Sequence, residues 1–140
     1  MQEGIAEYVT DTHPLVWHLW EESKLSGAAK QAFEAVDRGE AIIHIPTICF
    51  VEAVFLSESG KIPEGLYDHL IELIQKGSDT GSYRVVPLTL AVATALRAVP
   101  RPVIRELPDR VIAATALERG LPLITKDEAI RRWDGITTLW

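Results

Sequence analysis

Cysteine is almost absent from this sequence: the 140 residues contain only one, Cys49. An internal disulfide is therefore impossible, and no Cys/His pattern has the spacing of a zinc site. No apolar run is long enough to cross a bilayer. The first residues, MQEGIAEYVTD, lack the basic start and apolar middle of a signal peptide. We therefore expect a protein of the reducing cytoplasm that has no membrane association.

Positive charge is also scarce. Lys and Arg together number 14 against 20 Asp and Glu, which gives a formal net charge of −6. Nonspecific nucleic-acid binding normally relies on an excess of Lys and Arg, so this total argues against it. Bound metal cations or a local basic patch can reverse the sign where it matters, and nucleic-acid binding therefore stays open.

The sequence does contain a regular alternation of short apolar runs and helical patterns, without repeats, linkers or low-complexity tracts. Its length suits one domain, residues 1–140. The runs predict strands at 5–11, 41–45, 83–88, 121–125 and 136–140. Helices are predicted at 13–20, 26–37, from 47 through Glu52, 64–76, 89–98, 109–119 and 126–133, with a turn at 77–82 and a loop at 99–108. This alternation predicts an α/β fold with a mostly parallel sheet and helices on both faces.

Helix boundaries carry their own signals. Ser26, Thr47 and Thr89 each precede a helical pattern and are expected to cap the helix N-terminus with their hydroxyl groups. Gly39 and Gly120 follow such patterns and are expected to end their helices.

Four acidic residues fall at or shortly after the predicted carboxyl ends of strands. Asp11 ends the first strand, Glu52 lies about one turn into the helix after AIIHI, Asp109 opens a helix, and Asp127 follows LPLIT. Open parallel sheets bind their ligands at this edge. Because converging carboxylates repel one another, we expect a hard divalent cation, Mg²⁺ or Mn²⁺, to compensate them.

Each acid also has a purely structural interpretation. Asp11 and Asp127 could simply cap the helices that follow them, and Asp109 could favour a helix dipole. Glu52 lies in the neutral run PTICFVEAVFL, where an ionised side chain is costly to bury without a partner. A Lys or Arg partner is the alternative to a metal there.

Together these segments resemble the PIN-domain family, particularly its small VapC-like ribonuclease toxins. The resemblance runs from about Tyr8 to Trp140, through YVTDTHPLVWHLW, IPTICFVEAVFLSESGKI, VVPLT, LPDRVIAATALERGLPLITKDEAI and TTLW. It implies a three-layer α/β/α sandwich whose acids bind Mg²⁺ or Mn²⁺ and cleave single-stranded RNA. Matched position by position, those catalytic and metal-binding acids are Asp11, Glu52, Asp109 and Asp127.

Three further residues are secondary candidates. Thr47 matches the small hydroxyl residue before the glutamate helix, although capping is its simpler role. Thr125 could orient a ligand, or it could merely be a buried strand residue. Glu106 stands near the place where family members often carry an Asp, so it could reach the site or face solvent.

An acidic nuclease must still hold RNA. Four arginines lie in a short window in which only Glu106 and Asp109 oppose them: Arg97, Arg101, Arg105 and Arg110. Their planar guanidinium groups suit phosphate contacts, so they are candidate RNA ligands. Surface pairing with other acids is the alternative. His13, two residues after Asp11, could touch RNA or only pack.

The helix HPLVWHLW is too apolar for a solvent-facing helix, and Trp17 lies off the row of Val16 and Trp20. Part of this surface could therefore meet another chain, although the tryptophans could also belong to the core. The family resemblance implies two protein partners, a second copy in a homodimer and a small inhibitory antitoxin.

Other functions remain to be weighed. A PIN-like scaffold that binds RNA or protein without cutting would be expected to lack an acid, whereas all four positions are filled here. A receiver domain needs an Asp at the end of its central strand, and neither AIIHI nor VVPLT ends in one. A haloacid-dehalogenase-type phosphatase needs D-x-D after the first strand, where this chain has DTH.

Overall fold

The computed structural model describes residues 4–140, with the side chains of residues 77–80 left aside. Its sheet has five strands in the order β3-β2-β1-β4-β5, and every neighbouring pair is parallel. The strands are β1 (Ala6–Thr10), β2 (Ala41–Pro46), β3 (Tyr83–Val86), β4 (Leu123–Ile124) and β5 (Thr138–Leu139).

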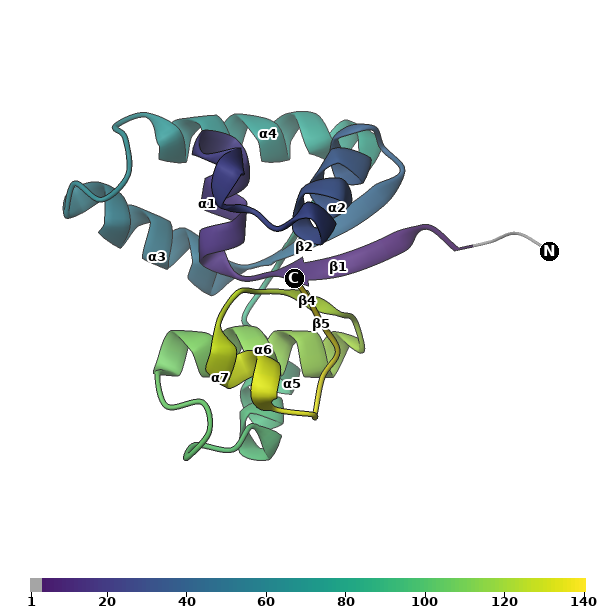
Figure 1. Cartoon of the computed structure of the whole chain (residues 1–140), viewed down its shortest axis with the longest axis vertical. Coiled ribbons are helices and arrows are strands. Elements are labelled where there is room, and N and C mark those ends of the chain that lie inside the picture. The colour runs from purple at the N-terminus through teal and green to yellow at the C-terminus, as the bar shows by residue number, and fades with distance from the viewer. Residues whose placement is uncertain (1–3) are drawn as a thin grey trace.

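Helices cover both faces of this sheet. The helices are α1 (Thr12–Trp20), α2 (Gly27–Asp37), α3 (Thr47–Glu58), α4 (Leu66–Thr80), α5 (Leu90–Ala95), α6 (Leu107–Arg119) and α7 (Glu128–Arg132), with 3₁₀ turns η1 (Glu22–Lys24) and η2 (Leu96–Ala98). Helices α1 to α4 lie on one side of the sheet and α5 to α7 on the other (Figure 1). The predicted α/β/α sandwich is therefore confirmed.

The central strands are buried because helices cover them on both sides. In β2, Ile43 and Ile45 are fully buried, and Phe33 of α2 belongs to the same core. Ile112 of α6 and Ile124 of β4 join this core. A strand covered on both faces reads as a continuous apolar run, which is why AIIHI could be recognised in the sequence. Within the described residues no helix is both long and apolar enough to cross a lipid bilayer.

The order of the strands places a site between β1 and β4. The chain moves from β1 outward to β2 and β3, then returns to the other side of β1 with β4 and β5. Such a reversal opens a crevice at the carboxyl ends of the two strands beside it. Asp11 immediately follows β1, and Lys126 and Asp127 follow β4, so their side chains start at this crevice.

The predicted helix caps are partly correct. The side chains of Ser26 and Thr89 accept hydrogen bonds from the backbone N–H groups of Ala29 and Val92, and so cap α2 and α5. Gly120 ends α6 with a φ of 66°, in the left-handed region that glycine tolerates best.

Two local predictions are wrong. Thr47 is the first residue of α3 rather than its cap, because Pro46 occupies the capping position and the Thr47 hydroxyl donates to the carbonyl of Val86, 2.9 Å away. The stretch 77–82 is not a turn throughout, since α4 continues to Thr80. That helix stops at Gly81, whose φ is 73°.

Candidate active site

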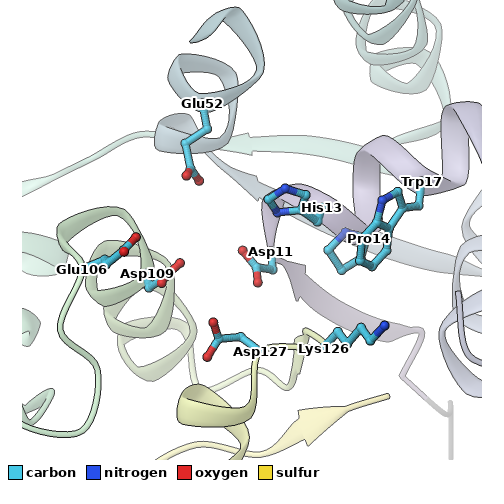
Figure 2. Close-up of a pocket in the computed structure, with 9 residues that line it drawn as sticks. All are labelled: Asp11, His13, Pro14, Trp17, Glu52, Glu106, Asp109, Lys126 and Asp127. Atoms are coloured by element: carbon cyan, nitrogen blue, oxygen red, sulfur yellow. The ribbon is translucent and has the colours of Figure 1, made fainter. Parts of the chain in front are cut away.

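Five carboxylates face one open pocket at the crevice, with a volume of about 500 Å³. Figure 2 shows Asp11 at its centre, with Glu52 on one side, Glu106 and Asp109 on another, and Asp127 opposite Glu52. The residues that line it are Asp11, His13, Pro14, Trp17, Glu52, Glu106, Asp109, Lys126 and Asp127. All four acids expected from the sequence, and Glu106 as well, therefore come together.

Asp11 is held from two sides. Its Oδ1 accepts a hydrogen bond of 2.8 Å from the backbone N–H of Thr12, and thereby caps α1. Its Oδ2 accepts a bond of 2.8 Å from the hydroxyl of Thr125, a fully buried residue. Asp11 is thus both a helix cap and a pocket residue, and Thr125 orients this acid.

Thr125 also connects Asp11 to Asp127. The backbone N–H of Asp127 donates to Thr125 Oγ1 at 3.1 Å, while Asp127 Oδ1 accepts from the backbone N–H of Ile130 at 3.0 Å and caps α7. The predicted cap and the predicted pocket position are again compatible, because a cap occupies one carboxylate oxygen. Thr125 therefore sets the relative position of two acids that are 116 residues apart in sequence.

Glu52 projects from α3 and is held by Thr12, whose hydroxyl donates to Glu52 Oε1 at 2.5 Å. Among the described residues no Lys or Arg forms an ion pair with Glu52. The neighbours of Glu52 along the helix are less buried than its sequence indicated, since Val51 and Phe55 are 58% and 65% exposed. The role of Thr12 was missed, although a hydroxyl residue directly after a strand-terminal acid was a signal for it.

Asp109 lies in the first turn of α6, which begins at Leu107 rather than at Asp109 itself. Burial, and then the negative charges of the other pocket acids, raise the pKa of Asp109 to about 7. Glu106 precedes the helix and its side chain is exposed at the pocket edge. Burial and the neighbouring acids therefore both disfavour ionisation of Asp109.

The same effects act on Asp11 and Glu52. Burial raises the pKa of Asp11, against the hydrogen bonds from Thr125 and Thr12. Burial likewise raises the pKa of Glu52, against the hydrogen bond from Thr12, and the charge of Asp11 adds to the rise. The pocket thus gathers acids that burial, together with mutual repulsion, makes hard to ionise at the same time.

This set of residues fits a hard divalent cation. The donors are carboxylate oxygens, the ligands that Mg²⁺ and Mn²⁺ prefer. Across the part of the chain that the structure describes, no three His, Cys, Asp or Glu side chains lie close enough to enclose an ion. Mg²⁺ typically binds one or two carboxylates and keeps several water ligands, so such an open arrangement suits it.

The four candidate arginines do not act as one group. Arg105 lines a second pocket of about 690 Å³, which adjoins the first because both are bordered by Glu106, Asp109 and Asp127. Arg132, which sequence reasoning missed, lines the same second pocket. Of the four candidate arginines, Arg105 is therefore the one that lies beside the acids.

The other three arginines lie elsewhere. Arg97 and Arg101 are exposed and border neither pocket. Arg110 donates from Nη2 to the carbonyls of Leu96 and Val99, both at 3.1 Å, so it stabilises the segment before α6. Thr47 also lies outside the acid pocket, beside the end of β3.

Comparison with known proteins agrees with this geometry. A family described as PIN domain matches residues 8–136. Ribonuclease VapC22 of Mycobacterium tuberculosis is 31% identical over 132 residues, which cover 93% of this chain and 95% of that protein.

Solved structures show the same fold. VapBC2 of Rickettsia felis, bound to a DNA fragment from its promoter, aligns with a TM-score of 0.66 at 14% identity, over 94% of this chain and 96% of that one. A toxin–antitoxin complex from Klebsiella pneumoniae aligns with a TM-score of 0.60 at 21% identity, over 94% of this chain and 96% of that one. FitAcB of Neisseria gonorrhoeae aligns with a TM-score of 0.61 at 17% identity, over 94% of this chain and 95% of that one.

Proposed function

The chain belongs to the PIN-domain family, and from this membership and its acid-lined pocket we propose that it is a metal-dependent endoribonuclease that cleaves single-stranded RNA. The observation that carries the proposal is the convergence of Asp11, Glu52, Asp109 and Asp127 on one pocket from four separate segments of the chain. The similarity to a protein named ribonuclease VapC22 supports the choice of RNA as substrate.

Asp11, Asp109, Glu52 and Asp127 would hold Mg²⁺ or Mn²⁺, directly or through water. The bound cation supplies Lewis acidity, which lowers the pKa of a water molecule and offsets charge that builds up on the phosphate. Thr125 and Thr12 fix the carboxylates of Asp11 and Glu52 by hydrogen bonds, so these two acids are oriented before the cation binds. Glu106 is a further candidate at the rim.

Basic residues next to the acids would receive the RNA backbone. Arg105 and Arg132 border the pocket that adjoins the acids, and Lys126 lines the acid pocket itself. Arg97 and Arg101 are exposed on the segment leading to Arg105 and can contact phosphates farther along the strand. Arg110 is left out of this set, because its guanidinium group is used by backbone carbonyls.

We further propose that the protein is the toxin of a toxin–antitoxin pair. The structures that share its fold include complexes named VapBC2 and a toxin–antitoxin complex. The activity would then be restrained by a small antitoxin protein. Homodimer formation stays a prediction.

The test is RNA cleavage by the purified chain with Mg²⁺, with Mn²⁺ and with EDTA, beside Asp11→Asn. Removing the Asp11 charge changes almost no volume, so the variant should fold and lose activity. Cleavage products that need the metal and vanish in the variant are the expected result. Cleavage that persists in EDTA or in the variant would contradict the proposal. A folded protein that binds RNA but never cleaves it would be the alternative scaffold.

A further inference from the structure

One wall of the acid pocket is aromatic and basic, and the proposed cation site makes no use of it. This wall comprises His13, Pro14 and Trp17 of α1, together with Lys126 from the loop after β4. Figure 2 shows Trp17 and Lys126 on one side of Asp11, with Glu106 and Asp109 on the opposite side. The pocket therefore extends from the acids to the side chain of Trp17.

Trp17 is braced by two other rings. Its ring centroid lies 6.0 Å from that of Trp140, in an edge-on arrangement at 60°, and 5.6 Å from that of His13. Trp17 and Trp140 are half-buried, and His13 is exposed. The side chain of Trp17 is thus held in place while part of it stays open to the pocket, as a stacking platform requires.

Two ammonium groups lie over this indole. Lys126 Nζ is 5.7 Å and Lys24 Nζ is 5.9 Å from the Trp17 ring centroid. Lys24 is shared with other groups, since its Nζ is also 5.9 Å from the Trp20 ring centroid and 3.4 Å from Glu21 Oε2. These distances are near the limit of about 6 Å for a cation–π contact, so the exposed lysines can move aside when another group stacks on the ring. The charge of Lys126, which lines the pocket, would then be available to a phosphate beside a stacked base.

Aromatic rings combined with cations are the chemistry that recognises unpaired nucleotides, because every base has a face that can stack on an aromatic side chain. In a duplex the base faces are already stacked on their neighbours and are not accessible. A strand with its phosphate at the acids would bring a neighbouring base to Trp17, because both line one pocket.

We propose that Trp17, braced by His13 and Trp140, is a base-stacking subsite for an unpaired nucleotide next to the scissile phosphate, with Lys126 contacting a flanking phosphate. This proposal rests on the proposed function, since it takes RNA as the substrate. It assigns the preference for single strands to a specific side chain.

The test measures binding rather than cleavage. In the Asp11→Asn background, fluorescence anisotropy would follow binding of a labelled single-stranded RNA of about 12 nucleotides, a length suited to single-strand grooves. A duplex of the same sequence is bound in parallel. Trp17→Leu is compared with Trp20→Leu, because Trp20 lies in the same helix, is 43% exposed and does not line the pocket.

Trp17→Leu should weaken binding of the single strand about tenfold, whereas Trp20→Leu should leave it unchanged. Trp17→Phe, which keeps an aromatic face, should retain most of the affinity. The duplex should bind weakly to all variants. Equal affinity of Trp17→Leu and its parent for the single strand would overturn the proposal.

Circular dichroism shows whether Trp17→Leu is folded. If it is not, photocrosslinking of a 5-iodouridine RNA to the parent decides the question. An adduct on the peptide that contains Trp17 supports the subsite, and adducts found only elsewhere overturn it. Cleavage by the wild-type chain is scored separately, so loss of the stacking proposal and loss of the nuclease proposal give different results.

Discussion

The hydroxyl of Thr12 donates a hydrogen bond of 2.5 Å to Glu52 Oε1, and so connects the helix that follows β1 to the helix that follows β2. Thr12 is buried, and its own backbone N–H donates to Asp11 Oδ1. One residue thus contacts two of the acids. It is a positioning residue, because it acts through them.

Thr12→Val keeps the shape of the side chain and removes its hydroxyl. We expect RNA cleavage to fall by about 10–100-fold, the usual cost of losing a group that orients a metal ligand. Thr12→Ser, which retains a hydroxyl, should keep most of the activity. The Mg²⁺ concentration at half-maximal rate should rise in the valine variant. A lower rate with no change in this concentration would indicate a structural role alone.

The second prediction concerns carboxylate repulsion. Burial and the charge of Asp11 raise the pKa of Glu52, so ionising this side chain costs stability in the metal-free protein. Glu52→Gln should therefore raise the melting temperature of the metal-free protein by about 2–5 °C. Glu58→Gln, an exposed change at the end of the same helix, should have little effect. A clear loss of stability in Glu52→Gln would instead show that the hydrogen bond from Thr12 to the ionised carboxylate outweighs the repulsion.

The raised pKa of Asp109 predicts how the stability of the metal-free protein depends on pH. Its pKa is about 7 in the folded protein against an ordinary value of 3.8. Between these values the unfolded chain has lost a proton that the folded protein keeps, so this group lowers the free energy of unfolding as pH rises toward 7. Asp109→Asn removes the effect. Urea denaturation of the metal-free proteins should show a stability gain in the variant that is larger at about pH 8 than at about pH 5.

A gain for Asp109→Asn that is the same at both pH values would contradict this account. With Mg²⁺ added, the wild-type protein should become more stable than Asp109→Asn, because the cation offsets the carboxylate repulsion that the variant lacks.

Outside the acid pocket, His18 supplies another pH-dependent prediction, in which the native side chain stabilises the fold instead of destabilising it. Its ring lies between Glu22 Oε2 at 3.2 Å and Asp37 Oδ2 at 3.0 Å, and it stacks on Phe33. Burial opposes its charge, but Asp37 and Glu22 outweigh burial and raise the pKa of His18 above 6.5. For Asp37 burial is likewise outweighed, by hydrogen bonds from His18 and Tyr83, so its pKa falls below 3.8.

The contribution of His18 to stability is complete below pH 6.5 and is lost as pH rises through its raised pKa, whereas that of Asp37 is complete above pH 3.8. His18→Gln should therefore destabilise the protein more at about pH 5.5 than at about pH 9 in urea denaturation. An equal loss at both values would show that packing on Phe33, rather than charge, is what His18 contributes.

Much of the fold could be predicted because its signals are local. Strand β2 is a short apolar run covered on both faces, and Ser26, Thr89 and Gly120 mark helix ends by their own chemistry. The acids could be placed at one edge because they follow strands of a parallel sheet, where carboxyl ends gather.

The features that escaped prediction depend on partners distant in sequence. The hydroxyl of Thr47 bonds to the carbonyl of Val86 on the neighbouring strand, which no pattern around residue 47 indicates. Arg110 bonds to carbonyls 11 and 14 residues before it. The continuation of α4 through residues 77–80 shows folded context overriding the turn tendency of GSDT.

The central claim is that the acid pocket is a divalent cation site, and titration of the purified chain with Mn²⁺, followed by electron paramagnetic resonance, tests it directly. The wild-type protein should bind Mn²⁺ in competition with Mg²⁺, and Asp11→Asn and Asp109→Asn should each lose most of this binding while remaining folded. Mn²⁺ binding that is absent from the folded wild-type protein, or equally strong in all three, would contradict the account.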